Sequence, residues 1–135
     1  MPGFITPKQI VPVADLEDAS VYGYSQCVRV GPFVYLAGQC GLGTDHRVVS
    51  PEFEPQAHAA LERVRSAVEA AGGTIHDIVT MTVFITDTDL GRIFTSLRRE
   101  FFGHDFPASA LIGVSTLMVP GAMIEIQATA IISGS

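Results

Sequence analysis

The sequence predicts an α+β domain in which a mixed β-sheet carries two helices on one face. Strand-like and helix-like segments follow one another in the order β-β-α-β-α-β-β. Right-handed crossovers place both helices on the same face of such a sheet. Residues 1–135 are enough for one hydrophobic core, and no linker, repeat or low-complexity tract divides them. We therefore expect a single domain whose second sheet face has no cover from its own chain.

Residues 1–20 are expected to form an N-terminal extension with an edge strand. Prolines interrupt this segment, and proline is tolerated in an edge strand because one side of the strand makes no ladder hydrogen bonds. The apolar pairs at residues 4–5 and 10–11 are the candidate strand residues. The rest of the extension is expected to be loop.

A β-hairpin is expected next. Residues 25–30 and 33–39 are strand-like and flank the breaker pair Gly31-Pro32. Three glycines within residues 38–43 end the second strand, and glycine allows unusual backbone angles or a close approach of the backbone to a ligand. This glycine segment opens no helix, so it is not a dinucleotide-binding fingerprint.

Two amphipathic helices and a central strand follow. Residues 51–71 repeat alanine, valine and leucine at helical spacing, and Gly72-Gly73 ends this helix. Residues 78–86 are rich in β-branched side chains and predict a central strand. Residues 90–102 carry an apolar stripe and predict the second helix.

The last segment contains two apolar runs, residues 108–114 and 123–132, which we expect to face each other across the turn at Val119-Pro120-Gly121. The second run alternates, so that its isoleucines and alanines share one face while Glu125 and Gln127 share the other. This polar face is either solvated or lines a shared pocket.

The composition favours an oligomer and argues against a nucleic-acid partner. Hydrophobic residues make up 47% of the chain and charged residues 16%, which leaves little polar cover for a small monomer. A partner subunit is the natural cover for the open sheet face. The net charge is −6, and the eight basic residues do not cluster beyond Arg98-Arg99, so no basic stripe for nucleic acid is expected.

Neither secretion nor membrane insertion is expected. The N-terminus lacks the charged and apolar regions of a signal peptide, and no apolar run reaches about 20 residues. Cys27 and Cys40 form no CxxC motif, and they are expected to be buried free thiols of a cytoplasmic protein. Cys40 is the more exposed of the two and the candidate for a reactive thiol, although a buried, inert thiol is the expectation for both. The four histidines share no metal-ligand spacing, so no metal site is expected.

Several short motifs occur together and in order. They are Tyr24-Ser25-Gln26-Cys27-Val28, Ala37-Gly38-Gln39, Glu69-Ala70-Ala71-Gly72-Gly73, Thr82-Val83-Phe84-Ile85-Thr86-Asp87, Phe106-Pro107-Ala108 and Ile124-Glu125-Ile126. Through these motifs the chain resembles the Rid (reactive-intermediate deaminase) family, also called YjgF-like proteins or, under an older name, endoribonuclease L-PSP. The resemblance extends over about residues 20–132.

This resemblance implies a chorismate-mutase-like α+β fold and a homotrimer around a central barrel. In active members, clefts between subunits hydrolyse short-lived imines or enamines to a 2-oxo acid and ammonia, and no cofactor is needed. The implied partners are other copies of the chain and a small-molecule ligand at the subunit interface.

Site residues are carried over from the family motifs by position. The implied substrate-binding residues are Tyr24, Gly38, Gln39, Cys40, Thr95 and Ser109. The implied catalytic residues are Glu125, Gln127 and Ser109. Glu125 is the remaining carboxylate and the candidate general base, Gln127 would orient substrate or water, and Tyr24 would shape the pocket.

Four positions depart from the family pattern. Ser109 stands where the family has an arginine that clamps the substrate carboxylate, and Gln127 stands where a glutamate is often found. Thr95 and Arg63 stand where the two helices carry asparagines. A serine hydroxyl contributes about 1 kcal/mol as a neutral hydrogen bond, against about 2–3 kcal/mol for a charged pair. The replacements argue against standard 2-imino acid deamination and favour a less anionic ligand.

Two functions therefore stay open. The first is hydrolysis or binding of a small reactive enamine, imine or related carbonyl metabolite. The alternative is a non-catalytic small-ligand-binding or chaperone-like trimer on the same fold. Ribonuclease activity, suggested by the older family name, is opposed by the acidic composition.

Overall fold

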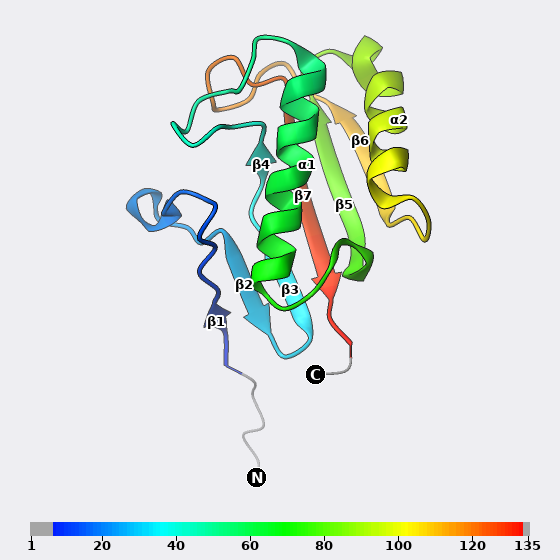
Figure 1. Cartoon of the computed structure of the whole chain (residues 1–135). Helices are drawn as coiled ribbons and strands as arrows, with labels where there is room; N and C mark the ends of the chain where they lie inside the picture. Colours follow the sequence, from blue (N-terminus) through cyan, green and yellow to red (C-terminus); the bar gives the residue numbers. More distant parts are fainter. Residues whose placement is uncertain (1–6, 134–135) are drawn as a thin grey trace.

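The computed structural model describes residues 7–133, which form a mixed β-sheet with two helices packed on one face (Figure 1). Within these residues the sheet has seven strands, in the spatial order β1-β2-β3-β7-β5-β6, and β4 also pairs with β7. The strands are β1 (Gln9–Ile10), β2 (Cys27–Val30), β3 (Phe33–Leu36), β4 (Gln39–Cys40), β5 (Ile78–Ile85), β6 (Ala108–Gly113) and β7 (Ile124–Ile131). The helices are α1 (Phe53–Ala70) and α2 (Gly91–Phe102). The predicted α+β class is confirmed.

The N-terminal strand and the hairpin lie at one edge of the sheet. β1 pairs antiparallel with β2 and is the outermost strand on this side, so Ile10 lies in a strand, while residues 4–5 lie outside the described part of the chain. β2 and β3 form the predicted hairpin, with Val30 opposite Phe33 and a positive φ of 57° at Gly31. Only glycine adopts such an angle readily, which explains its place in this turn.

The predicted second strand of the hairpin is broken into two. β3 ends at Leu36, and Gln39–Cys40 form the separate strand β4, which pairs with β7 further along the same edge. The chain passes the Glu125 carboxylate at the break, and a Cβ added at Gly38 would overlap that carboxylate. The glycine therefore permits a close approach of the backbone, although to a side chain of the same chain.

The prediction that residues 108–114 and 123–132 face each other is wrong. β5 lies between them, parallel to β6 and antiparallel to β7. The crossover through α2 delivers β6 parallel to β5, and ten residues then separate β6 from β7. This connection is long enough to pass over the end of β5, so the strand richest in β-branched residues is paired on both sides.

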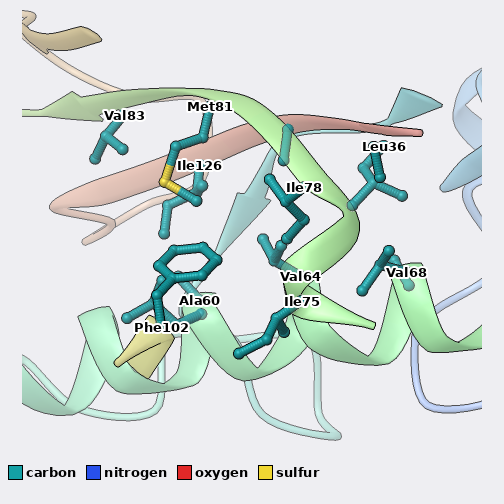
Figure 2. Packing of buried hydrophobic residues seen from close by; sticks show 14 of the residues in the cluster. Leu36, Ala60, Val64, Val68, Ile75, Ile78, Met81, Val83, Phe102 and Ile126 are labelled. Atoms are coloured by element: carbon teal, nitrogen blue, oxygen red, sulfur yellow. The ribbon is translucent and has the colours of Figure 1, made fainter. Parts of the chain in front are cut away.

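The core lies between the sheet and the helices. Figure 2 shows Ala60, Val64 and Val68 of α1 beneath Met81 and Ile126 of the sheet, and all five are buried. The small alanine and valine side chains let α1 approach the sheet closely, as its sequence predicted. Burial of this apolar surface is the main force that holds the helices on the sheet.

No element within residues 7–133 covers the opposite face of the sheet. This face presents large apolar side chains at substantial exposure, including Phe33 (43%), Tyr35 (48%) and Ile131 (41%). Alternation along β7 places Gln127 and Thr129 on this face as well. The face is called the open face below. No helix within residues 7–133 has both the length and the apolar character needed to cross a membrane.

Candidate functional site

Five of the eight predicted site residues form two groups, which lie on opposite faces of the sheet, and Tyr24, Gln39 and Gln127 belong to neither. The first group, called the carboxylate cluster, consists of Gly38, Cys40 and Glu125 on the open face. The second group surrounds a cavity between α2 and β6 and is called the basic pocket. Its lining residues are Thr95, Arg98, Arg99, Phe106, Pro107 and Ser109.

The carboxylate cluster forms because β4 and β7 are neighbours. Cys40 lies directly opposite Glu125 in the antiparallel pair, and its thiol donates to Glu125 Oε1 at 3.6 Å. Gly38 packs against the other side of the same carboxylate. A carboxylate held by a thiol and a glycine backbone is restricted to one orientation, which a positioned general base requires.

Cys40 does not offer a thiolate at neutral pH. Burial and the neighbouring Glu125 carboxylate raise its pKa to about 12, and burial raises the pKa of Cys27 to about 11. The prediction of buried free thiols is confirmed, since both cysteines are buried and free, and Cys40 at 5% is slightly more exposed than Cys27 at 0%. Pairing of β4 with β7 covers the Cys40 side chain, a contact that its neighbours in sequence do not reveal.

Tyr24 and Gln127 lie around the carboxylate cluster. Partial burial and the negative charge of Glu17 raise the pKa of Tyr24, and Glu125 and Cys40 add to this rise. The phenol is therefore a protonated hydrogen-bond donor at neutral pH. Gln127 is exposed, two residues beyond Glu125 on the same face of β7.

Gln39 is buried on the α1 side, away from the open face. Its side chain is 1% exposed, donates to Gln26 Oε1 at 2.7 Å and accepts from Arg63 Nε at 3.0 Å. Arg63 also forms an ion pair with Glu17 at 2.6 Å. This chain of contacts ties the N-terminal extension to α1 and to the start of β4. Gln39 thus positions the neighbouring Gly38 and Cys40.

The polar network around Gln39 contains residues that the sequence analysis did not assign to the site. Within it, the hydrogen bond and charge of Arg63 outweigh the effect of burial and lower the pKa of Glu17. Arg63 lies between Ala60 and Ala67 on the buried stripe of α1. A charged residue within an apolar stripe was the signal in the sequence, because such a group needs a buried partner.

The basic pocket is built at the outer edge of the sheet. Ser109 is opposite Met81 in the parallel pair and so shares the helix-covered face, where its hydroxyl accepts from Arg98 Nη1 at 2.6 Å. Thr95 donates to the Gly91 carbonyl at 2.9 Å. The cavity measures about 530 Å³. The structure thus places Thr95 and Ser109 at the same cavity. In a single chain, both residues are separated from the carboxylate cluster by the sheet.

Neither group offers a metal site. Among residues 7–133, no three His, Cys, Asp or Glu side chains gather in a way that would hold a metal ion. The Glu125 carboxylate and the Cys40 thiol of the carboxylate cluster are groups that can transfer a proton or form hydrogen bonds. The basic pocket can bind negative charge.

Comparisons with known proteins match nearly the whole chain. Residues 16–132 fit the family model described as endoribonuclease L-PSP. A 2-iminobutanoate/2-iminopropanoate deaminase of Dermatophagoides farinae is 32% identical over 130 residues, which cover 95% of this chain and 99% of the relative. A Salmonella typhimurium protein of the same name is 34% identical over 116 residues, 84% of this chain and 90% of the relative.

The solved structures agree with the sequence relatives. The crystal structure of RidA from an Antarctic Psychrobacter matches with a TM-score of 0.84 at 30% identity, covering 92% of this chain and 99% of that one. The shared fold, the matched motifs and the coverage lead to one assignment. This chain belongs to the Rid family, the YjgF-like proteins whose older name is endoribonuclease L-PSP.

Proposed function

We propose that the protein is a homotrimer that hydrolyses a small reactive imine or enamine in a cleft between subunits. The observation that carries this proposal is the Glu125 carboxylate, held by the Cys40 thiol and the Gly38 backbone on the open face. Relatives at 32% and 34% identity bear the name of 2-iminobutanoate/2-iminopropanoate deaminases, which supports the same class of reaction.

The proposed reaction needs only water and the residues of the cleft. Glu125 accepts a proton from a water molecule while the water oxygen bonds to the carbon of the C=N group. Glu125 returns this proton to the nitrogen, which gives a carbinolamine. The proton of the new hydroxyl then passes to the amino nitrogen, the C=O bond forms as the C–N bond breaks, and ammonia leaves a carbonyl product. Gln127 orients the substrate or the water, and the protonated Tyr24 phenol closes the pocket.

The open face supports the proposed trimer. Its exposed Phe33, Tyr35 and Ile131 form an apolar surface of the kind that subunits bury. Packing the open faces of three copies around a common axis would cover this surface. It would also allow the basic pocket of one subunit to approach the carboxylate cluster of another. A monomer mass in sedimentation velocity would contradict the trimer and the cleft together.

A non-catalytic ligand-binding or chaperone-like trimer is the alternative. Two substitutions favour it, since Gln127 provides an amide where a carboxylate would act as a base, and Ser109 provides a hydroxyl where the family has an arginine. We place either function in the cytoplasm, because free thiols suit a reducing compartment.

Imine clearance distinguishes the two functions. A pyridoxal-phosphate lyase generates 2-iminopropanoate or 2-iminobutanoate in situ, and its disappearance is followed with and without the protein. We expect the wild type to accelerate clearance and Glu125→Gln to lose about 100-fold or more of that rate, as for removal of a general base. Glu69→Gln, an exposed change on α1, is the matched control and should keep the full rate. No acceleration by the wild type would favour the alternative.

A further inference from the structure

The basic pocket contains two arginines without an acidic partner. α2 and β6 lie side by side at the edge of the sheet (Figure 1), and the pocket opens between them. Within residues 7–133, neither Arg98 nor Arg99 has a carboxylate within ion-pair distance. The chain as a whole has 14 acidic and 8 basic residues. In so acidic a chain, two adjacent cations that form no ion pair within the described residues leave positive charge available for a ligand, although Glu100 follows them in the sequence.

The Arg98 guanidinium is oriented but not saturated. It donates from Nη1 to the Ser109 hydroxyl at 2.6 Å, and its central carbon lies 5.1 Å from the centre of the Phe94 ring. A guanidinium has five N–H donors, so one neutral acceptor leaves most of them for a ligand. Partial burial lowers the pKa of Arg98, and an anion in the pocket would offset this loss of hydration.

We propose that Arg98 binds the carboxylate group of the ligand, with the Ser109 hydroxyl as a second donor. The hydroxyl accepts from Arg98 and can donate its own proton to the anion, so the two groups act together. Arg99 contributes charge to the same cavity. The ligand is then more anionic than expected from the absence of arginine at position 109, because the cation comes from α2 instead of β6.

The pocket suits a small carboxylate better than a phosphate. One guanidinium fork and one hydroxyl match the two oxygens of a carboxylate. Phe106 and Pro107 line another part of the cavity and suit a short apolar chain. This inference rests on the proposed function for the identity of the ligand's reacting end, whereas anion binding is measurable without catalysis.

Titration with 2-oxobutanoate, a stable product of imine hydrolysis, tests the inference on the full chain. Calorimetry gives the affinity, and ¹⁵N heteronuclear spectra identify the amides that respond. We expect shifts at Ser109 and along α2, and a loss of about 10- to 100-fold in affinity for Arg98→Gln, the range for a charged hydrogen bond. Arg98→Lys should bind with intermediate affinity because it keeps the charge but loses the fork.

Arg47→Gln is the matched control. It removes the same charge from an exposed loop residue outside the pocket and should keep the wild-type affinity within about twofold. Circular dichroism and melting temperature establish that each variant is folded. Equal losses for Arg98→Gln and Arg47→Gln would overturn the inference, since general charge would then explain the binding.

Three further outcomes would overturn the assignment of Arg98 to the ligand carboxylate. Binding of inorganic phosphate in preference to 2-oxobutanoate would overturn the carboxylate assignment, and so would the absence of 2-oxobutanoate binding to the wild type. Failure of the proposed function can be distinguished from failure of this inference. A protein that binds 2-oxobutanoate through Arg98 but does not clear imines would contradict the proposed catalysis and support the anion site. Full imine clearance by Arg98→Gln would overturn the inference and leave the catalysis intact.

Discussion

Arg63 and Arg98 are both packed against the body of the protein, but their surroundings differ. Arg63 has a side chain that is 10% exposed, and it donates to the Glu17 carboxylate at 2.6 Å and to Gln39 at 3.0 Å. Arg98 donates to one neutral hydroxyl, that of Ser109, and faces a cavity. The first arginine has an acid partner inside the chain, whereas the second has none within the described residues.

This difference in partners identifies Arg63 as a positioning residue and is consistent with the proposed role of Arg98 in ligand binding. A buried cation with its own carboxylate has its charge satisfied, so its removal affects folding. A cation without an acidic partner contributes little to folding, so its removal affects what binds. Stability and ligand affinity should therefore respond to the two arginines in opposite ways.

Arg63→Met should produce the largest loss of stability. It would leave the Glu17 carboxylate and the Gln39 carbonyl oxygen without their partner, and breaking a buried pair costs about 3–5 kcal/mol of unfolding free energy. Urea unfolding measures this change. Arg65→Met on the same helix is the control, because its ion pair with Glu62 is exposed and contributes about 0–1 kcal/mol. Equal losses for the two variants would show that the buried network has no special role.

Glu17→Gln should cost less, about 1–3 kcal/mol at pH 7, and its effect should depend on pH. The pKa of Glu17 is lowered in the folded protein from its ordinary value of 4.5. The unfolded chain therefore binds more protons, so the contribution of this carboxylate is fully present above pH 4.5 and is lost as the pH falls through the folded pKa. The stability difference between wild type and Glu17→Gln should shrink below pH 4.5. A difference that stays constant from pH 7 to pH 3 would refute this linkage.

Arg98→Gln should have the smallest effect on folding, within about 1 kcal/mol, because it removes one exposed hydrogen bond and the contact of the guanidinium with the Phe94 ring. The measurement is the same urea titration, carried out without ligand. Added 2-oxobutanoate should then stabilise the wild type more than the variant. A loss of several kcal/mol without ligand would place Arg98 beside Arg63 as a structural residue and remove the contrast between them.

The helices and most strands were predictable because their signals are local. The apolar repeat of α1 and the β-branched run of β5 each specify one element from a short stretch of sequence. The placement of β6 was not predictable in this way. Residues that are close in the chain, at the ends of β6 and β7, are separated in space by β5, since strand order depends on the crossover through α2.

For the candidate site, too, local sequence patterns predicted some side-chain positions but not the contacts between distant segments. Alternation along β7 correctly put Glu125 and Gln127 on one face, because side-chain direction along a strand has a fixed period. Gln39, by contrast, lies just past a break in the hairpin, and the break decides that its side chain meets Arg63 instead of the open face. The contact between Arg98 and Ser109 joins a helix to a strand, so neither segment alone could reveal it.

Because both native thiols are buried, a dye can be attached selectively to a cysteine introduced at the surface. With pKa values of about 11 and 12, Cys27 and Cys40 hold almost no thiolate at neutral pH and should react slowly with maleimide dyes. A single cysteine introduced at exposed Thr44 would then be labelled selectively in the otherwise natural sequence. Energy transfer between dyes on different copies would report whether copies associate, as the proposed trimer requires, without first replacing the native cysteines.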